Sequence, residues 1–317
     1  MSSVNLNEIF FPHLNQQLKR VKNEEINFVH YTNAETAFKL IKNQEIWLRN
    51  VAVMNDFREF EHGKECLVKL LDDSEEGQAL KNIFNVINPD IFDEVYSNFK
   101  NWGPFIKDDF YISCFSEHKN KDDDIGKLSM WRAYGGNAGV AIIFKQDFFS
   151  EIYTNYGLDF SSVAYLNADE LKQEINHLTT TISSNIEQIK SLPIKDLIFY
   201  LFNIFRFSAL CNKHVGFDEE KEWRLIAIAS QNIKNDLISQ EIETIRGIPQ
   251  NILKIRLKGI ALDNLVFKDM IHKVIIGPCL YPWTIRSSIA TALREIGVTD
   301  PEKIIHISNI PLRVNSN

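Results

Sequence analysis

The stretch CNKHVGFDEEKEWRLIAIA, residues 211–229, is the part of the chain around which we build the expected fold. Residues 222–228 are rich in β-branched and aromatic side chains, a composition that predicts a β-strand. If the extended backbone begins by Glu220, the side chains of Glu220, Glu222 and Arg224 lie on one side of this strand. Such charges are costly to bury, so the pattern indicates either a functional cleft or an exposed turn with ordinary ion pairs.

The composition is that of an ordinary globular protein. Of 317 residues, 44% are hydrophobic and 24% are charged, which argues against a disordered chain. The net charge of -7 argues against generic binding to a nucleic-acid backbone. The first residues lack a signal-peptide pattern, and the most apolar run, residues 198–211, is too short and too polar to cross a bilayer. We therefore expect a cytoplasmic protein, with its cysteines reduced and without a membrane partner.

Short runs of β-branched and aromatic residues predict strands that are separated by helical segments. The expected strands are residues 26–32, 46–49, 110–116, 140–144, 222–228, 253–257, 273–278 and 303–307. Their order mixes hairpin-like and crossover connections, which predicts an α+β protein with mixed sheets. No repeat and no long linker interrupts the chain, so we expect a single domain over residues 1–317 with a helical insertion at about 168–212.

Metal-ligand spacing is weak in this sequence. His62 and Cys66 lie one helical turn apart, as do Cys211 and His214. Neither pair is joined by a second pair at ligand spacing, so we expect no zinc site.

A Mg²⁺-dependent nuclease is an alternative, because residues 218–221, DEEK, place carboxylates next to a lysine. The pattern is short and common. In a strand, Lys221 would also face away from Glu220 and Glu222.

Cleavage of a nicotinamide dinucleotide is a second possible chemistry. It passes through an oxocarbenium-like centre, which a carboxylate near the ribose 2′-hydroxyl stabilises. Glu222 is the candidate carboxylate, Tyr134 or Trp131 the aromatic wall for nicotinamide, and His30 with Thr32 the polar anchor. Each of these residues also has an ordinary structural explanation, since large aromatic side chains usually pack in the core.

Several short motifs follow one another along the chain. They are His30-Tyr31-Thr32, Ile46-Trp47-Leu48, Asn55-Asp56, Ser113-Cys114-Phe115-Ser116, Met130-Trp131-x-x-Tyr134, Glu220-Lys221-Glu222-Trp223-Arg224, Ile276-Gly277-Pro278 and the segment from Ser308 to Arg313. In this order they resemble the bacterial and phage domain-of-unknown-function 2971 family over residues 28–313. Phe57 departs from the pattern, because many members carry proline there.

The resemblance implies a fold and a site. The order of an H-Y-T strand, a serine-bearing strand and an E-x-E strand is similar to ADP-ribosyltransferase-like folds. His30 matches the first motif, Ser113 or Tyr134 the second, and Glu222 the third. Such folds have two small, strongly bent sheets around a central cleft.

We therefore expect one cleft in which nine residues act on NAD as a substrate. The expected catalytic residues are Glu222, Glu220, His30 and Tyr134, and the expected NAD-binding residues are Tyr31, Thr32, Ser113, Trp131 and Arg224. The favoured activity is that of an ADP-ribosyltransferase or NAD glycohydrolase, as in a toxin or phage-defence effector. The alternatives are the nuclease and a non-enzymatic module that binds a nucleotide or a peptide. The acceptor, whether DNA, RNA, protein or water, stays open.

Overall fold

The structure is a computed structural model, and it divides into two compact units. It describes residues 5–53, 57–119, 124–149, 156–233, 236–258 and 266–312, apart from the side chains of residues 57–59 and 103–108. Unit 1 consists of Met1–Arg20, Val51–Asp108 and Ser161–Glu219, and unit 2 of Val21–Asn50, Asp109–Phe160 and Glu220–Asn317. The chain therefore passes between the units several times.

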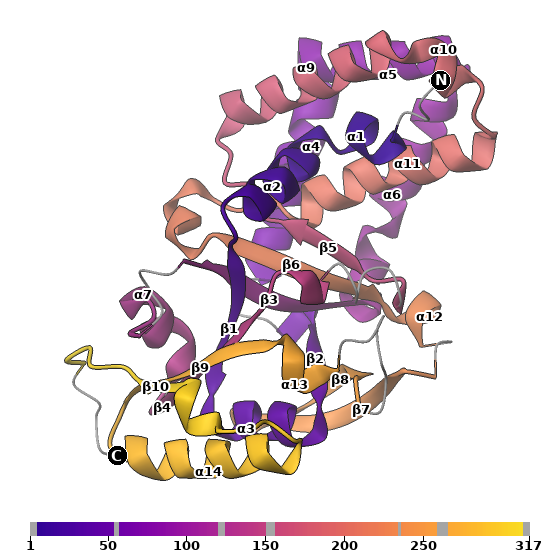
Figure 1. The fold of residues 1–317 in the computed structure, drawn as a ribbon. Coiled ribbons are helices and arrows are strands. Elements are labelled where there is room, and N and C mark those ends of the chain that lie inside the picture. Colours follow the sequence, from indigo (N-terminus) through magenta and orange to yellow (C-terminus); the bar gives the residue numbers. More distant parts are fainter. Residues whose placement is uncertain are drawn as a thin grey trace. The chain divides into compact units, whose positions relative to one another are not determined.

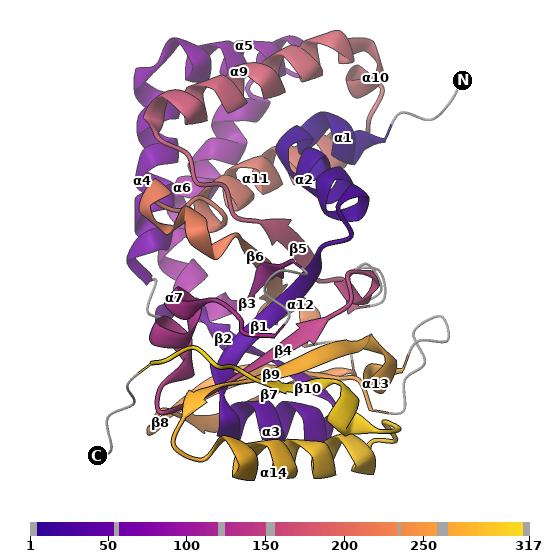
Figure 2. The same ribbon diagram turned by 60° about the vertical axis from the view of Figure 1, so that its left-hand side comes forward.

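Unit 1 is mainly helical (Figures 1 and 2). Its helices are α1 (Leu6–Phe10), most of α2 (Pro12–Asn23), α4 (Phe57–Asp73), α5 (Glu75–Ile87), α6 (Ile91–Asp109), α9 (Ala168–Ser184), α10 (Ile186–Lys190) and α11 (Ile194–Leu210), with the short turns η1 (Val51–Val53) and η4 (Val215–Glu220). The predicted insertion at 168–212 corresponds to α9, α10 and α11, which pack with the helices of residues 51–108.

The core of unit 1 is aromatic. The Phe205 ring on α11 contacts Phe92, Tyr96 and Phe99 of α6, with ring centroids between 5.5 and 5.6 Å apart. Close approach of α4 to α11 depends on Gly63, because a Cβ atom there would lie 2.5 Å from the Ala209 carbonyl oxygen. Helix packing at this contact therefore requires glycine.

Unit 2 contains a mixed sheet. Its strands are β1 (Asn27–Asn33), β2 (Glu45–Asn50), β3 (Phe110–His118), β4 (Ala138–Phe144), β6 (Glu222–Ile228), β7 (Ile238–Ile245), β8 (Ile248–Arg256), β9 (Ile271–Cys279) and β10 (Ile305–Ile307), with the first residues of β5 (Asp159–Ser162). The order is β10-β9-β4-β1-β3-β2-β8-β7, and β6 pairs with β3 and β5. The pairing of β10 with β9 is parallel, whereas the pairings of β1 with β4 and of β3 with β6 are antiparallel.

Short helices accompany the sheet of unit 2. They are α3 (Ala34–Asn43), α7 (Leu128–Met130), the π-helical turn η3 (Trp131–Gly135), α12 (Ala229–Asn232), α13 (Phe267–Met270), α14 (Pro282–Glu295) and η5 (Pro301–Lys303). Figures 1 and 2 both show α3 and α14 side by side, in agreement with their contacts.

The sheet forks at β3. The β6 strand pairs with β3 from Phe110 to Ser116. On the other edge, β1 pairs with β3 at residues 116–118 and β2 pairs with it at residues 111–112. Residues 113–115 lie between these two partners, so β1 and β2 diverge from the same edge of one strand.

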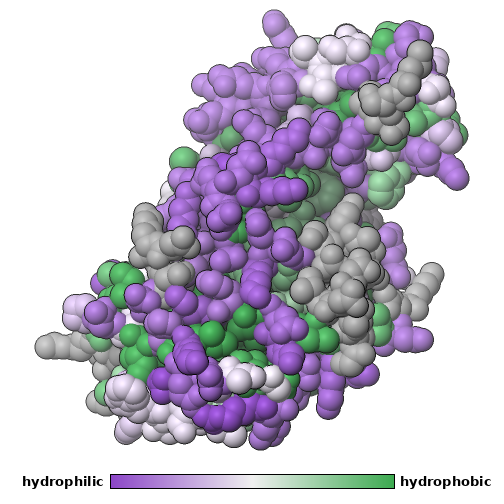
Figure 3. Space-filling view, in the orientation of Figure 1, coloured by the Kyte–Doolittle hydropathy of each residue, from purple (hydrophilic) through white to green (hydrophobic). Residues whose placement is uncertain are grey.

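The two faces of the sheet carry different cores. On one face, aromatic rings pack edge to face or stacked, and they include Phe28, Phe115, Phe149, Phe160 and Trp223. The opposite face carries an apolar cluster around Trp131. Figure 3 shows that hydrophilic residues dominate the surface on the side drawn there, with hydrophobic residues in separate areas.

The prediction of a fold that mixes helices with a mixed sheet is confirmed. The predicted strand at residues 222–228 has the same ends as β6. Strand β7 lies outside the expected strands, because Ile238, Ile242 and Ile245 among polar residues form no regular apolar alternation. The described strands form one forked ten-stranded sheet in place of the two small sheets that the resemblance implies. Among the helices of the described residues, none is long and apolar enough to cross a membrane.

Candidate functional site in unit 2

A buried ion pair lies at the start of β6. Glu222 and Arg224 project from the same side of the strand, and only 4% and 5% of their side-chain surfaces are exposed. Arg224 Nε donates to Glu222 Oε1 at 2.8 Å, and Arg224 Nη2 donates to Glu222 Oε2 at 3.2 Å. A guanidinium that engages both carboxylate oxygens fixes the orientation of the carboxylate as well as compensating its charge.

Strand register defines what shares the face of Glu222. Ser116 of β3 lies opposite Glu222, and Val29 of β1 lies opposite Ser116. Because side chains alternate along a strand, His118 and Tyr31 also belong to this face. His118 is buried and is the last residue of β3, two residues beyond the expected strand at residues 110–116.

The Trp131 cluster covers the neighbouring part of this face. The Trp131 ring packs edge to face against Tyr31 at 4.9 Å and lies so close to Gly139 and Gly277 that a Cβ atom on either would fall within 2.9 Å of the indole. The indole Nε1 donates to the Ile125 carbonyl at 2.9 Å. Trp131 is thus a packed core residue.

Tyr134 is the more accessible aromatic residue at this position. It is partly exposed and packs against the Trp131 cluster from the π-helical turn η3. Single π-helical turns occur frequently at functional sites. Met130 Sδ lies 4.0 Å from Ser116 Oγ, which connects the cluster to the residue opposite Glu222.

Glu220 does not belong to the strand, contrary to the prediction. It is buried at the end of η4, and Lys221 between it and Glu222 has φ 45°, in the left-handed region. The Lys221 carbonyl accepts the backbone N–H of Glu117 at 3.0 Å. The alternation that would put Glu220 beside Glu222 therefore starts only at Glu222. Residues other than glycine adopt such φ values infrequently, and some of them mark functional sites.

The expectation that His30 shares a cleft with Glu222 is not met by the strand registers. His30 follows Val29, which shares the face of Glu222, so its side chain lies on the opposite side. The His30 ring lies 5.5 Å from that of Phe115, within the aromatic core. The side chains of Ser113 and Thr32 also lie on the side away from Glu222. Ser113 lies opposite Leu225, which alternates with Arg224 on β6, and Thr32 lies opposite Val140, two residues beyond His30 on β1.

His30 has a structural function at the fork. Its Nδ1 lies 2.9 Å from the Cys114 carbonyl oxygen, in the part of β3 where β1 and β2 diverge. A carbonyl only accepts, so Nδ1 carries the proton and Nε2 carries the lone pair of the neutral ring. Burial lowers the pKa of His30 below its usual value, although the bond to Cys114 opposes this shift.

Glu117 is a second buried carboxylate that the sequence analysis missed. It lies near the end of β3, and its Oε1 accepts the indole N–H of Trp223 at 3.1 Å. Its register partner is Phe28, so it faces the aromatic core and not Glu222. The expected strand ends at Ser116, whereas β3 continues through His118 because β1 pairs with it there.

The two His–Cys patterns approach each other, since the His62 and His214 ring centroids lie 6.3 Å apart. Among the described residues, no group of three or more His, Cys, Asp or Glu side chains is arranged to hold a metal ion. His62 and Cys66 contact each other on α4. Asn55 and Asp56 of the Asn-Asp motif, and Arg313 of the last motif, lie outside the described residues.

Comparison with known proteins adds one finding. Residues 130–225 match the model of a family described as "Protein of unknown function (DUF2971)". The match supports the resemblance to DUF2971 over this segment, which begins at Met130 in the Trp131 cluster and ends beside Arg224. No curated protein and no solved structure matches the chain.

The segment that matches DUF2971 thus contains the partly exposed Tyr134 together with the oriented Glu222 carboxylate. A carboxylate held in a desolvated site stabilises nearby positive charge more strongly than one in water. The arrangement is chemically suited to a reaction that develops positive charge on its substrate.

Proposed function

We propose that unit 2 binds NAD and breaks the bond between its nicotinamide and ribose. The observation that carries this proposal is the buried Glu222 carboxylate, which two N–H groups of Arg224 hold in one orientation. A carboxylate has about four lone-pair positions, so Glu222 can accept a ribose 2′-hydroxyl while Arg224 stays bound.

The reaction requires stabilisation of one cationic centre. As the C1′–N bond breaks, its electron pair stays with the nicotinamide nitrogen, and the ribose becomes oxocarbenium-like. Water, or a hydroxyl, amine or carboxylate of an acceptor, then attacks C1′, and an attacking water, hydroxyl or amine releases a proton. Glu222 stabilises the positive charge of the ribose. Tyr134 supplies the aromatic wall for the nicotinamide ring, with Trp131 packed behind it.

The fork of the sheet supports the same assignment. The strand that bears His30-Tyr31-Thr32 leaves β3 at the fork, and the strand that bears Glu222 pairs along the other edge of β3. This ordering is similar to ADP-ribosyltransferase-like folds. The proposal uses Tyr31 and Ser116 on the Glu222 face, while His30 positions β1 through its bond to Cys114.

The test is nicotinamide release from NAD by the full chain, followed by liquid chromatography. We expect Glu222→Gln to lower the rate by about 100-fold or more, since it removes the charge and retains the shape. Glu243→Gln is the matched control, because Glu243 is also a carboxylate of unit 2 in an ion pair. Its rate should stay within about twofold of wild type, since Glu243 has no part in the proposed site.

Two results would contradict the proposal. One is equal nicotinamide release by wild type and Glu222→Gln. The other is no release by the wild type in the presence of water, protein, DNA or RNA as acceptor. Circular dichroism of each variant separates loss of activity from loss of folding.

A further inference from the structure

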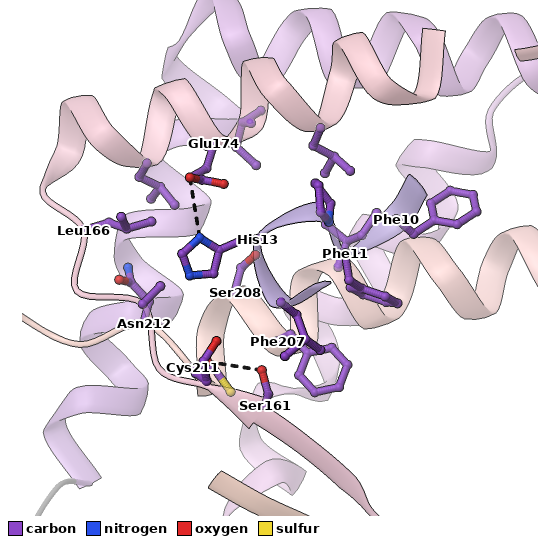
Figure 4. A pocket seen from close by; sticks show the side chains of 18 residues that line it. Phe10, Phe11, His13, Ser161, Leu166, Glu174, Phe207, Ser208, Cys211 and Asn212 are labelled. Carbon is purple, nitrogen blue, oxygen red and sulfur yellow. Dashed lines mark hydrogen bonds and ion pairs between the residues drawn. The ribbon is translucent and has the colours of Figure 1, made fainter. Parts of the chain in front are cut away.

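Two arginine side chains of unit 2 repel each other, Arg49 of β2 and Arg246 of the turn between β7 and β8. Titratable groups elsewhere meet a partner of the other kind. In a pocket of unit 1, for example, His13 faces Glu174, and Nδ1 and Oε1 lie 3.6 Å apart (Figure 4). Two like charges are unfavourable side by side unless a group of opposite charge compensates them, so the place of the two arginines suits an anion.

Gln250 of β8 holds the Arg49 side chain toward this turn. Arg49 Nε donates to Gln250 Oε1 at 2.9 Å, and Gln250 Nε2 donates to the Ile248 carbonyl at 3.3 Å. Ile248 is the first residue of β8 after the turn, and Gln250 is only 7% exposed. One buried amide therefore joins the guanidinium of Arg49 to the end of the hairpin that carries Arg246.

Both arginines are accessible and charged. Arg49 is partly buried and Arg246 is exposed. Burial, followed by the charge of Arg246, lowers the pKa of Arg49. Arginine nevertheless keeps its proton at neutral pH, so two positive charges meet here. In the part of the chain that the structure describes, no carboxylate forms an ion pair with Arg246.

The turn by itself does not explain its arginine. Arg246 and Gly247 connect Ile245 to Ile248, which pair with each other, and the φ angles of the two turn residues are 52° and 79°. A two-residue hairpin turn with two positive φ angles favours Asn, Asp or Gly at its first position. Residues held in such an unfavourable conformation cluster at ligand-binding sites.

Arg49 also lies on the sheet face of Glu222. It is opposite Ile112 of β3, which is opposite Ile226 of β6, and Ile226 and Glu222 project from the same side of β6. The proposed reaction uses this face, so NAD itself is one source of a diphosphate for the arginines.

We propose that Arg49 and Arg246 together bind a phosphate-containing anion, a phosphate monoester or a diphosphate. A phosphate monoester carries about two negative charges near neutral pH, which two arginines match. A guanidinium has five N–H donors in a planar fork, so Arg49 can bind phosphoryl oxygens while its Nε stays on Gln250. The bound anion also offsets the repulsion between the two guanidinium groups.

The test is binding of inorganic pyrophosphate to the full chain, measured by calorimetric titration in a buffer without divalent metal ions. We expect Arg49→Gln and Arg246→Asn each to weaken binding by about tenfold or more, because each removes charge-assisted hydrogen bonds. Arg246→Asn is the sharper variant, since asparagine suits the turn. Its melting temperature should therefore equal or exceed that of wild type while binding is lost.

Arg256→Gln is the matched control. Arg256 is an arginine of β8 whose Nη2 lies 2.9 Å from Glu241 Oε1, and its removal changes the net charge by the same amount. Binding of pyrophosphate should stay within about twofold of wild type, because the charge of an exposed residue outside the site is screened by salt. An equal loss for Arg256→Gln and Arg246→Asn would overturn the proposal, as would equal binding by Arg246→Asn and wild type.

The kinetics of nicotinamide release identify the source of the anion. If it is the diphosphate of NAD, Arg246→Asn should raise KM about tenfold and leave kcat within about twofold of wild type. An unchanged KM together with weakened pyrophosphate binding assigns the site to another phosphorylated molecule. A wild type that binds pyrophosphate without releasing nicotinamide contradicts the NAD reaction alone, whereas a wild type that does not bind millimolar pyrophosphate contradicts the anion site.

Discussion

Unit 2 contains two groups of ion pairs that use similar residues in different surroundings. Glu222 and Arg224 form a two-point pair that is almost completely buried. Lys254 of β8 instead meets Glu243 at 2.7 Å and Glu241 at 2.9 Å, and these carboxylates are 19% and 37% exposed. Lys254 itself is only 7% exposed, so the two groups differ in the solvation of their carboxylates.

The comparison shows which pair requires an explanation beyond stability. Charges on the outermost strands of a sheet discourage pairing with another chain, and β7 is the last strand in the order. The Lys254 group therefore has a structural reason. A buried pair costs desolvation that its attraction barely offsets, and an apolar pair of the same volume is often as stable. Stability alone therefore does not explain why this position carries the charged pair Glu222 and Arg224, whereas the function proposed above uses it.

The largest expected effect comes from removing Arg224 from the buried ion pair. Arg224→Met should lower the free energy of unfolding by about 3–5 kcal/mol, because it removes the guanidinium that binds both oxygens of a buried carboxylate. Urea unfolding followed by circular dichroism measures this change.

Lys254→Met is the control for Arg224→Met. Its carboxylate partners can regain water, so the loss should be about 1 kcal/mol. Equal losses for the two variants would show that burial does not distinguish the two groups.

A smaller effect is expected from the pH dependence of stability that Glu241 of the Lys254 group confers. The hydrogen bond from Lys254 lowers the pKa of Glu241 to about 2, from an ordinary value of 4.5. A lowered pKa means that the ionised carboxylate stabilises the fold above pH 4.5, and this contribution is lost as the pH falls toward 2.

Glu241→Gln removes this contribution. The difference in unfolding free energy between wild type and Glu241→Gln should therefore shrink as the pH is lowered from about 6 to about 3, a range that extends roughly 1.5 pH units to either side of the ordinary pKa. A difference that is constant over this range would contradict the assignment.

The smallest net effect is expected from replacing the buried pair as a whole. Glu222→Leu combined with Arg224→Met removes both charges, so the free energy of unfolding should return to within about 1 kcal/mol of wild type. Nicotinamide release by the double variant should be lower than that of wild type by about 100-fold or more, as expected for Glu222→Gln. If the double variant were as unstable as Arg224→Met alone, the pair would have a structural role that apolar packing cannot replace.

Local sequence patterns predicted individual elements of the site well. The composition of residues 222–228 predicted β6 with its observed ends, and the motif around Trp131 and Tyr134 marked a real packing cluster. These features depend on side chains that are close in the sequence, where period and propensity act directly.

Relations between elements were predicted less well. The position of Glu220 depends on the φ of 45° at Lys221. The residue types in that turn do not predict this backbone angle, because a left-handed φ is typical of glycine and not of lysine. The expected strand at residues 110–116 excludes the polar Glu117 and His118, yet pairing with β1 extends β3 through both. In each case a backbone contact from a distant segment outweighed the local preference.

The sequence by itself determined that the chain has alternating helices and strands, with a Glu-x-Arg pair on one side of a strand, because side-chain alternation is a local property. Only the tertiary structure decided which residues face that pair. A shift of one residue in strand register turns every side chain to the other face, and register is chosen by the packing of the whole sheet. For this reason Ser116, and not His30 or Ser113, lies on the face of Glu222.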